Sequence, residues 1–279
     1  LMVKTSLFVL APDIKEIEGC DILGGKLEDT VPKAKELGYD CVEIDMGDPD
    51  LFDTDGFKAI LEKNQMGVSL LNTGNINYAF GLSLVNADPE KEKQAFEKFT
   101  RIIDIAAKLG CYVQAGVSRG FAIPGKPYPY FKAKLVEVYK DLCDYAAAKN
   151  VELLLEYTNR FEINTVNNFA EARDIIERVN KPNMHLLLDT YHSYLEDPDV
   201  YETIYNAKDY VKVFHFHDSD RGPAGASNGV LDFEKIFRIL YDIKFSGFLS
   251  DGLLTTAIPE EQVKRSTSFL REMINAYRL

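Results

Sequence analysis

Residues 151–162 read VELLLEYTNRFE, an apolar run that ends in acid at Glu156. The run is short and nearly uninterrupted, which is typical of a strand buried on both faces in a parallel sheet. A second acid, Glu162, follows one short loop further along the chain. A lone acid at the end of a strand is usually solvated or caps the next helix, so the meaning of these two acids depends on the residues at the ends of the other strands.

Similar runs recur along the chain and alternate with segments patterned for helix. The predicted strands cover residues 4–10, 41–45, 67–71, 111–116, 151–156, 184–189, 210–217 and 245–250. The predicted helices cover residues 27–38, 53–64, 89–110, 130–150, 168–179, 198–208, 232–243 and 259–277. Gly38, Gly110 and Asn150 stand near the starts of strands, where a left-handed residue can end the preceding helix.

Eight strand–helix units in 279 residues predict an α/β fold, a single (β/α)8 TIM barrel in one domain over residues 1–279. A doubly wound open sheet is the alternative. Its usual phosphate loop, GxGxxG, would follow the first strand. The stretch VLAPDIKEIEGCDILGG, residues 9–25, has no such motif, so we expect the barrel.

The composition restricts the partners and the compartment. A net charge of −12 repels phosphate, so we expect no nucleic-acid partner. No apolar run approaches the roughly 20 residues of a membrane helix, and the N-terminal stretch lacks the layout of a signal peptide. The four cysteines form no Cys-x-x-Cys pair, and Cys41 and Cys111 each open an apolar run. This usage fits a cytoplasmic protein with no membrane partner.

Ligand-type side chains stand at the ends of several predicted strands, where a TIM barrel gathers its catalytic groups. Glu156, Asp189 and His215 end three successive strands about 4.8 Å apart and could converge on one ion. Two carboxylates and one imidazole suit Mn²⁺, Mg²⁺ or Co²⁺. Asp189 could instead cap the following turn, but the three residues together favour a metal site. Further polar residues at strand ends are Glu43, Asp45, Asn72 and Gln114.

Two histidines and an arginine stand close together in HFHDSDR, residues 215–221. His215 and His217 are two residues apart, so both point the same way from a strand. One could bind the metal while the other lines the pocket or bonds a carboxylate. Arg221 suits a substrate oxygen, or it could pair with Asp218 or Asp220.

Two further residues are candidates for holding a small substrate. His192 lies three residues past Asp189 and either faces the same pocket or is exposed. Asn72 opens NTGNINYAFG, whose amides and aromatic rings suit a sugar, although the stretch could also be an ordinary turn.

Three stretches resemble motifs of the xylose-isomerase-like superfamily of sugar isomerases and epimerases, and most closely the ketose 3-epimerases of the tagatose/psicose type. They are LEYTNRFE at 155–162, LLLDTYH at 186–192 and HFHDSDR at 215–221. The resemblance covers the chain from Val151 to its end, and the earlier half matches only in its strand–helix rhythm. The motifs are fairly specific together and weak singly.

The resemblance implies roles for these residues. Glu156, Asp189 and His215 would bind a divalent metal, and Glu156 would also act as a catalytic acid/base. The substrate, a small sugar or sugar derivative, would be held by Glu162, His192 and Arg221. The implied reaction removes a proton beside the ketone, passes through an enediolate and returns a proton on the opposite face, which requires two bases. Related barrels commonly associate, so a homo-oligomer, a dimer or tetramer, is expected.

The sequence departs from the family pattern at the eighth strand. The family has a fourth metal-binding Glu there, which is the second acid/base, and this chain has Gly252 at the matching position. Glycine offers neither a ligand nor a base. Three alternatives remain: Asp251 takes its place, water completes the metal shell, or ordinary epimerase activity is lost. Strand parity aims Asp251 toward the helices unless a bulge turns it.

The leading hypothesis is therefore a metal-dependent epimerase or isomerase of a ketose or sugar derivative. An inosose-dehydratase-like lyase is the first alternative, because it needs one base and a metal. A non-catalytic barrel that binds sugar is the second.

Overall fold

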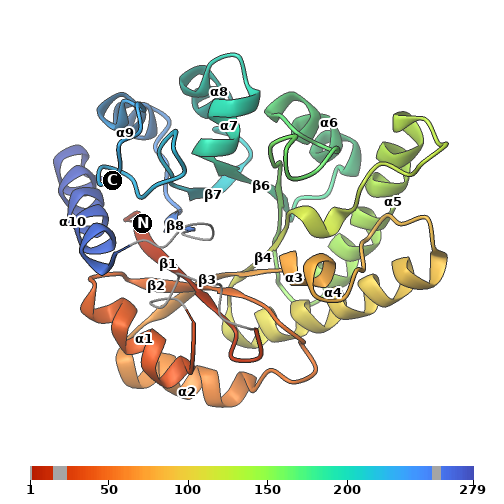
Figure 1. Cartoon of the computed structure of the whole chain (residues 1–279), viewed down its shortest axis with the longest axis horizontal. Helices are drawn as coiled ribbons and strands as arrows, with labels where there is room; N and C mark the ends of the chain where they lie inside the picture. The colour runs from red at the N-terminus through yellow and green to blue at the C-terminus, as the bar shows by residue number, and fades with distance from the viewer. Residues whose placement is uncertain (1, 15–23, 253–258) are drawn as a thin grey trace.

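The computed structural model describes residues 2–14, 24–252 and 259–279. In this part of the chain, eight parallel strands pair in sequence order and close into a barrel (Figure 1). The strands are β1 Lys4–Leu10, β2 Cys41–Asp45, β3 Gly67–Asn72, β4 Tyr112–Ala115, β5 Leu153–Glu156, β6 Met184–Asp189, β7 Val211–His215 and β8 Phe248–Asp251. The predicted (β/α)8 TIM barrel is confirmed, and the open-sheet alternative is wrong.

Helices surround the barrel and connect its strands (Figure 1). They are α1 Leu27–Glu36, α2 Thr54–Asn64, α3 Gly74–Tyr78, α4 Pro89–Leu109, α5 Tyr128–Ala147, α6 Phe169–Val179, α7 Thr190–Glu196, α8 Val200–Asn206, α9 Phe233–Asp242 and α10 Glu260–Tyr277, with a 3-10 turn η1 at Val117–Arg119. All eight predicted helices are present. The short elements α3, α7 and η1 were not predicted. With five and three residues, α3 and η1 are too short to show a helical period, and α7 begins directly after β6 with no loop to mark its start.

The predicted helix-ending residues adopt the left-handed conformation. Gly38, Gly110 and Asn150 have φ angles of +96°, +70° and +58°. Each lies two or three residues before its strand, so the chain reverses there from an outer helix into the barrel.

The barrel interior changes from apolar to polar toward the carboxyl ends of the strands. A small buried cluster of one residue from each of four strands fills its middle, and each member is followed two positions later by a polar residue. The pairs are Leu70 and Asn72, Leu154 and Glu156, Leu187 and Asp189, and Val213 and His215. Because side chains two apart share a face of a strand, the same parity that packs the interior aims the polar groups into the barrel mouth.

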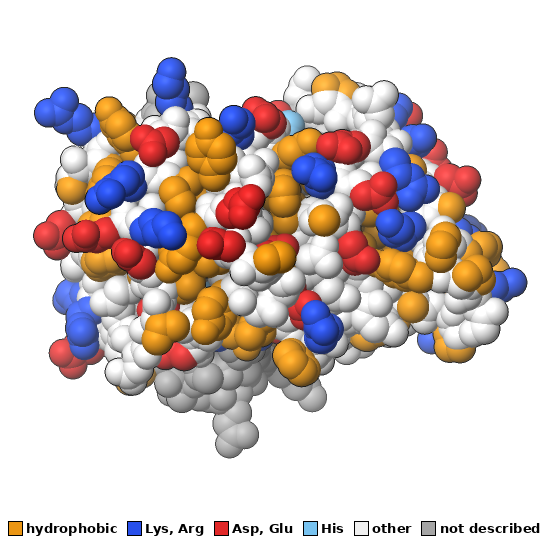
Figure 2. Space-filling model, turned by 90° about the horizontal axis from the view of Figure 1, so that it is seen from above, with side chains coloured by type: hydrophobic (Ala, Val, Ile, Leu, Met, Phe, Trp, Pro, Cys, Tyr) orange, Lys and Arg blue, Asp and Glu red, His pale blue; other side chains and the backbone are white. Residues whose placement is uncertain are grey.

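The surface of the described residues is mixed in character. Acidic, basic and hydrophobic side chains are interspersed over the face that Figure 2 presents. None of the described helices is both long and apolar enough to cross a membrane. Cys41, Cys111 and Cys143 are buried and unpaired, as expected for small core residues, and Cys20 lies outside the described residues.

Candidate active site

The carboxyl ends of the strands surround a pocket of about 990 Å³. Every residue predicted to act on metal or substrate lines it: Asn72, Glu156, Glu162, Asp189, His192, His215, His217 and Arg221. Gly252 also lines the pocket. Barrel closure thus brings together residues that are up to 180 positions apart in the sequence.

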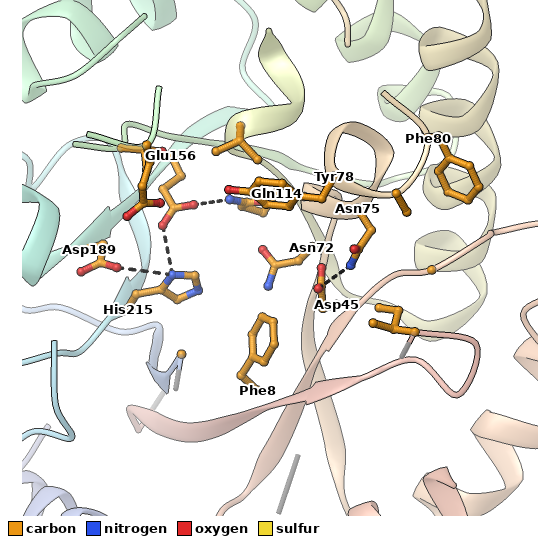
Figure 3. Close-up of a pocket in the computed structure, with 18 of the residues that line it drawn as sticks. Phe8, Asp45, Asn72, Asn75, Tyr78, Phe80, Gln114, Glu156, Asp189 and His215 are labelled. Atoms are coloured by element: carbon orange, nitrogen blue, oxygen red, sulfur yellow. Dashed lines mark hydrogen bonds and ion pairs between the residues drawn. The ribbon is translucent and has the colours of Figure 1, made fainter. Parts of the chain in front are cut away.

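Glu156, Asp189 and His215 converge on one side of the pocket (Figure 3). They offer ligand atoms that all lie within 4.8 Å of one another. His215 Nδ1 is 3.1 Å from Glu156 Oε1 and 4.0 Å from Asp189 Oδ2. Asp189 is also the N-cap of α7, because its Oδ1 accepts the Tyr191 N–H at 2.8 Å. Both roles considered for Asp189 therefore fit: one oxygen caps the helix and the other faces the cluster.

Glu43 fixes the orientation of His215 from the other side of the ring. Its Oε1 lies 2.9 Å from His215 Nε2, and its Oε2 accepts the Ser250 hydroxyl at 2.6 Å. Asn72 donates its side-chain amide to the same carboxylate. A carboxylate behind a ligating histidine selects the ring nitrogen that faces the metal. Glu43 stands at a strand end in the sequence, but nothing in the sequence indicated this contact with β7.

The charges of the cluster fit a divalent cation. Burial alone would raise the pKa of Asp189, but the neighbouring His217, His192 and His215 hold it well below its usual range. Burial would likewise raise the pKa of Glu156, and His215 lowers it. Two ionised carboxylates and an imidazole nitrogen form a donor set that Mn²⁺, Co²⁺ or Mg²⁺ can accept.

A buried arginine supports the backbone beneath Glu156. The Arg119 side chain is fully buried, and its guanidinium donates to the carbonyls of Gly116, Glu156 and Thr165 at 2.7, 2.9 and 2.6 Å. It also reaches the Val166 carbonyl at 3.1 Å. Among the described residues no carboxylate pairs with it. Arg119 therefore ties the end of β5 to the loop that carries the substrate candidates, a function that the sequence did not reveal.

Arg221 pairs with Glu162 across the pocket mouth. Its Nη1 lies 2.6 Å from Glu162 Oε1, and its guanidinium stacks over the Tyr191 ring at 5.2 Å. The alternative pairing with Asp218 or Asp220 is wrong. Those two carboxylates accept backbone N–H groups of their own loop instead. Arg221 and Glu162 thus form one hydrogen-bonding unit, although 59 residues separate them.

His192 is buried and belongs to the same polar network, so the alternative of surface exposure is wrong. Asn159 donates its amide to His192 Nδ1 at 2.9 Å and to Glu162 Oε1 at 2.8 Å. Because Nδ1 of His192 accepts this hydrogen bond, the proton of the ring is on Nε2, which lies 3.6 Å from Asp189 Oδ2. The network joins the metal cluster to Arg221 and presents several donors and acceptors to the pocket.

The eighth strand contributes no carboxylate to the pocket. Asp251 is buried on the outer side of the barrel, where it accepts the hydroxyls of Tyr39 and, at 3.2 Å, Ser266. Strand parity thus holds, and no bulge turns Asp251 inward. Gly252 faces the pocket beside His217. Of the three alternatives left by the sequence, substitution by Asp251 does not fit this geometry.

Asp45 lies on the side of the pocket away from the metal cluster, where Asn75 donates to it (Figure 3). Burial raises the pKa of this carboxyl to about 8. Its pKa in the folded protein lies above the unfolded value of about 3.9. The folded state therefore loses stability as the pH rises from about 4 to about 8, and the loss is complete above that range.

Replacement of Asp45 by asparagine is expected to remove this pH dependence, because the amide stays neutral and still accepts from Asn75. The stability of Asp45→Asn relative to wild type should grow by at most about 1.4 kcal/mol per pH unit between pH 4 and 8. Urea unfolding at pH 5 and pH 8.5 measures this change. The exposed Asp55→Asn is the control and should show no such trend. A difference between Asp45→Asn and wild type that stays constant with pH would contradict the assignment.

The closed (β/α)8 barrel and the acid–acid–imidazole cluster at its strand ends put this chain in the class of TIM barrels, which carry their active sites at the carboxyl face. The chain matches the family described as xylose isomerase-like TIM barrel over residues 31–273. The chain therefore belongs to this family, as the resemblance implied.

Several similar proteins are ketose epimerases. A ketose 3-epimerase of Arthrobacter globiformis is 28% identical over 222 residues, which are 78% of this chain and 74% of that protein. An L-ribulose 3-epimerase of Methylomonas sp. (strain DH-1) is 27% identical over 243 residues, 86% of this chain and 82% of that protein. A solved L-ribulose 3-epimerase structure superposes with a TM-score of 0.83 at 22% identity, covering 99% of this chain and 96% of the other. The predicted kinship with epimerases is thus confirmed.

Proposed function

We propose that this protein is a divalent-metal-dependent epimerase that acts on a ketose or ketose derivative through an enediolate intermediate. The observation that carries the proposal is the cluster of Glu156, Asp189 and His215 within 4.8 Å at the barrel mouth. Relatives of this chain are ketose 3-epimerases, and this similarity supports a free or modified ketose as the substrate.

Glu156, Asp189 and His215 would hold Mn²⁺, Mg²⁺ or Co²⁺. Such an ion supplies Lewis acidity to the ketone and its neighbouring hydroxyl, which makes the adjacent carbon more acidic. Glu43 and Gln114 keep the donors in place, since Glu43 bonds His215 and Gln114 donates to Glu156 Oε2. The pocket residues present therefore fit a divalent ion.

Glu156 would take the proton from the carbon beside the ketone. One of its oxygens accepts from Gln114, and the other lies against His215, so the carboxylate has a fixed orientation at the pocket wall. Its lowered pKa keeps it ionised near neutral pH, as a base must be.

The network of Glu162, Arg221 and His192 would orient the sugar. Arg221 and the Nε2–H of His192 donate, and Glu162 accepts, so alternate hydroxyl and carbonyl oxygens can be bound. Asn72, at the end of β3, lines the same pocket and would contact the substrate.

The absence of a carboxylate at Gly252 gives weight to a second candidate function. An epimerase must protonate the opposite face of the enediolate, whereas a lyase that eliminates water needs a base on one face only. Asp251 turns away from the pocket, so β8 supplies no acid to protonate the opposite face of the enediolate. This arrangement favours a dehydratase. Product analysis separates the two functions.

The test is incubation of the Mn²⁺-loaded protein with ketohexoses and ketopentoses in D₂O. Epimerisation would give an epimer with deuterium at the inverted carbon, and dehydration would give a product that has lost water. We expect a chelator to remove activity and Mn²⁺ to restore it. If the protein takes up no Mn²⁺ and leaves every ketose unchanged, a sugar-binding barrel without catalysis is the remaining function.

A further inference from the structure

The pocket extends beyond the metal cluster toward α3. Asp45, Asn75 and Phe80 line it away from the cluster (Figure 3), and Tyr78 lines it from the same helix as Asn75. We call these four residues the α3 side. The pocket volume of about 990 Å³ is at the upper end of the roughly 300–1,000 Å³ that is typical of pockets for drug-sized ligands. A single ketose is much smaller than such a ligand, so a ketose at the metal would leave room on the α3 side.

Two aromatic rings of the α3 side stand at the surface of the pocket. Tyr78 and Phe80 are 67% and 37% exposed. Lys98 Nζ lies over the Phe80 ring at 4.5 Å from its centre and is held 2.9 Å from Asp48 Oδ1. The ring thus has a fixed cation on one face although it is partly exposed. Exposed apolar groups that gather at a pocket commonly mark the place where a ligand packs.

Polar groups stand beside these rings. Asp45 is only 8% exposed, yet it lines the pocket. Its Oδ2 accepts from Asn75, and this is the one hydrogen bond that the Asp45 side chain makes among the described residues. Because buried polar groups are normally hydrogen-bonded, the remaining oxygen suits a ligand that carries hydroxyl groups.

A sugar ring needs both kinds of surface, because it presents a face of C–H groups and an edge of hydroxyls. The stretch NTGNINYAFG, residues 72–81, supplies three of the four residues of the α3 side. An alkyl or aryl group would also pack on Tyr78 and Phe80. It would, however, exclude water from Asp45 without replacing the hydrogen bonds that the water makes, which is costly.

We propose that the α3 side is a second sugar subsite, so that the substrate is a ketose joined to another sugar ring. This inference rests on the proposed function, because it requires the ketone to lie at the metal cluster. The second ring would then be attached at the end of the ketose that is remote from the ketone.

The test compares two ketoses that differ only in the second ring. Isomaltulose carries glucose on the terminal oxygen of fructose, and 6-O-methylfructose carries a methyl group there, so neither can close to a pyranose. Calorimetry measures the binding of each to the Mn²⁺-loaded protein, and steady-state kinetics measure kcat/KM where turnover occurs. We expect isomaltulose to bind at least about tenfold more tightly, because the second ring adds aromatic contacts and hydrogen bonds.

Removal of both rings tests the position of the subsite. Combining Tyr78→Ala with Phe80→Ala should reduce the preference for isomaltulose at least about fivefold. The control is Tyr241→Ala, because Tyr241 is 54% exposed on α9 and does not line the pocket, and it should keep the wild-type preference. Circular dichroism confirms that each variant is folded.

The outcomes separate this inference from the proposed function. A wild-type preference below about tenfold, or an unchanged preference in the folded double variant, would overturn the subsite while epimerisation of free ketoses still stands. Equally tight binding of 6-O-benzylfructose would show that the α3 side takes an apolar group, which would also overturn it. If isomaltulose binds as expected but no ketose is changed, the subsite stands and the proposed function fails.

Discussion

Replacement of Glu156 by glutamine is expected to abolish turnover while the protein stays folded. Glutamine keeps the shape of the side chain and can still contact Gln114 and His215 after a rotation of its amide. It loses the negative charge that binds the ion and the basic oxygen that removes the proton. A general base alone contributes about 10²- to 10⁴-fold, so kcat should fall by at least about a thousandfold.

The matched control for this variant lies at the other end of the same stretch. Glu152 precedes β5 at the amino-terminal end of the barrel, where its half-exposed carboxylate lies 3.5 Å from His185 Nε2. Glu152→Gln should therefore leave kcat unchanged. Steady-state kinetics of both variants, with circular dichroism as a check on folding, make the comparison. Full turnover by Glu156→Gln would rule out its role as base.

Replacement of Arg119 by methionine is expected to destabilise the protein strongly. Methionine fills much of the space but donates nothing to the carbonyls of Gly116, Glu156 and Thr165. Breaking a buried charged network and leaving buried acceptors unsatisfied costs roughly 3–5 kcal/mol in the free energy of unfolding. Urea unfolding at pH 7 measures the loss.

An exposed arginine provides the control for Arg119. The Arg101 side chain is 54% exposed and pairs with Asp50, which is 59% exposed. Arg101→Met should change the free energy of unfolding by no more than about 1 kcal/mol, because exposed ion pairs contribute little. Equal effects of the two substitutions would show that the carbonyl contacts of Arg119 do not stabilise the fold.

The sequence alone predicted the strands and the long helices because their signals are local. Each strand is a short apolar run, each long helix has an amphipathic period, and left-handed residues such as Gly110 and Asn150 end helices before strands. The element α3 lacks that signal because it has only 5 residues, and α7 begins directly after β6 with no loop to mark its start. In α7 the cap Asp189 was visible in the sequence, but the helix was not.

The candidate site was predictable as a set of residues and not as a set of contacts. A single rule, that a barrel gathers its chemistry at the carboxyl ends of strands, selected Glu156, Asp189 and His215. The sequence offered only Asp218 and Asp220 as alternative partners for Arg221, because they are near it along the chain, whereas Glu162 is near it in space. Sequence distance gives no measure of which charge a flexible guanidinium reaches.

The sequence by itself was enough to predict the barrel, the family and the acids at the carboxyl ends of the strands, because each of these follows from patterns within a few residues. Only the tertiary structure decided that Glu43 holds His215, that Asp251 turns outward and that His217 fills the space beside Gly252. The contacts of Glu43 with His215 and of Asp251 with Tyr39 join the first and last strands of the sheet, which come together because β8 pairs with β1 when the barrel closes. Contacts across that junction join residues far apart in the chain, so no local stretch of sequence indicates them.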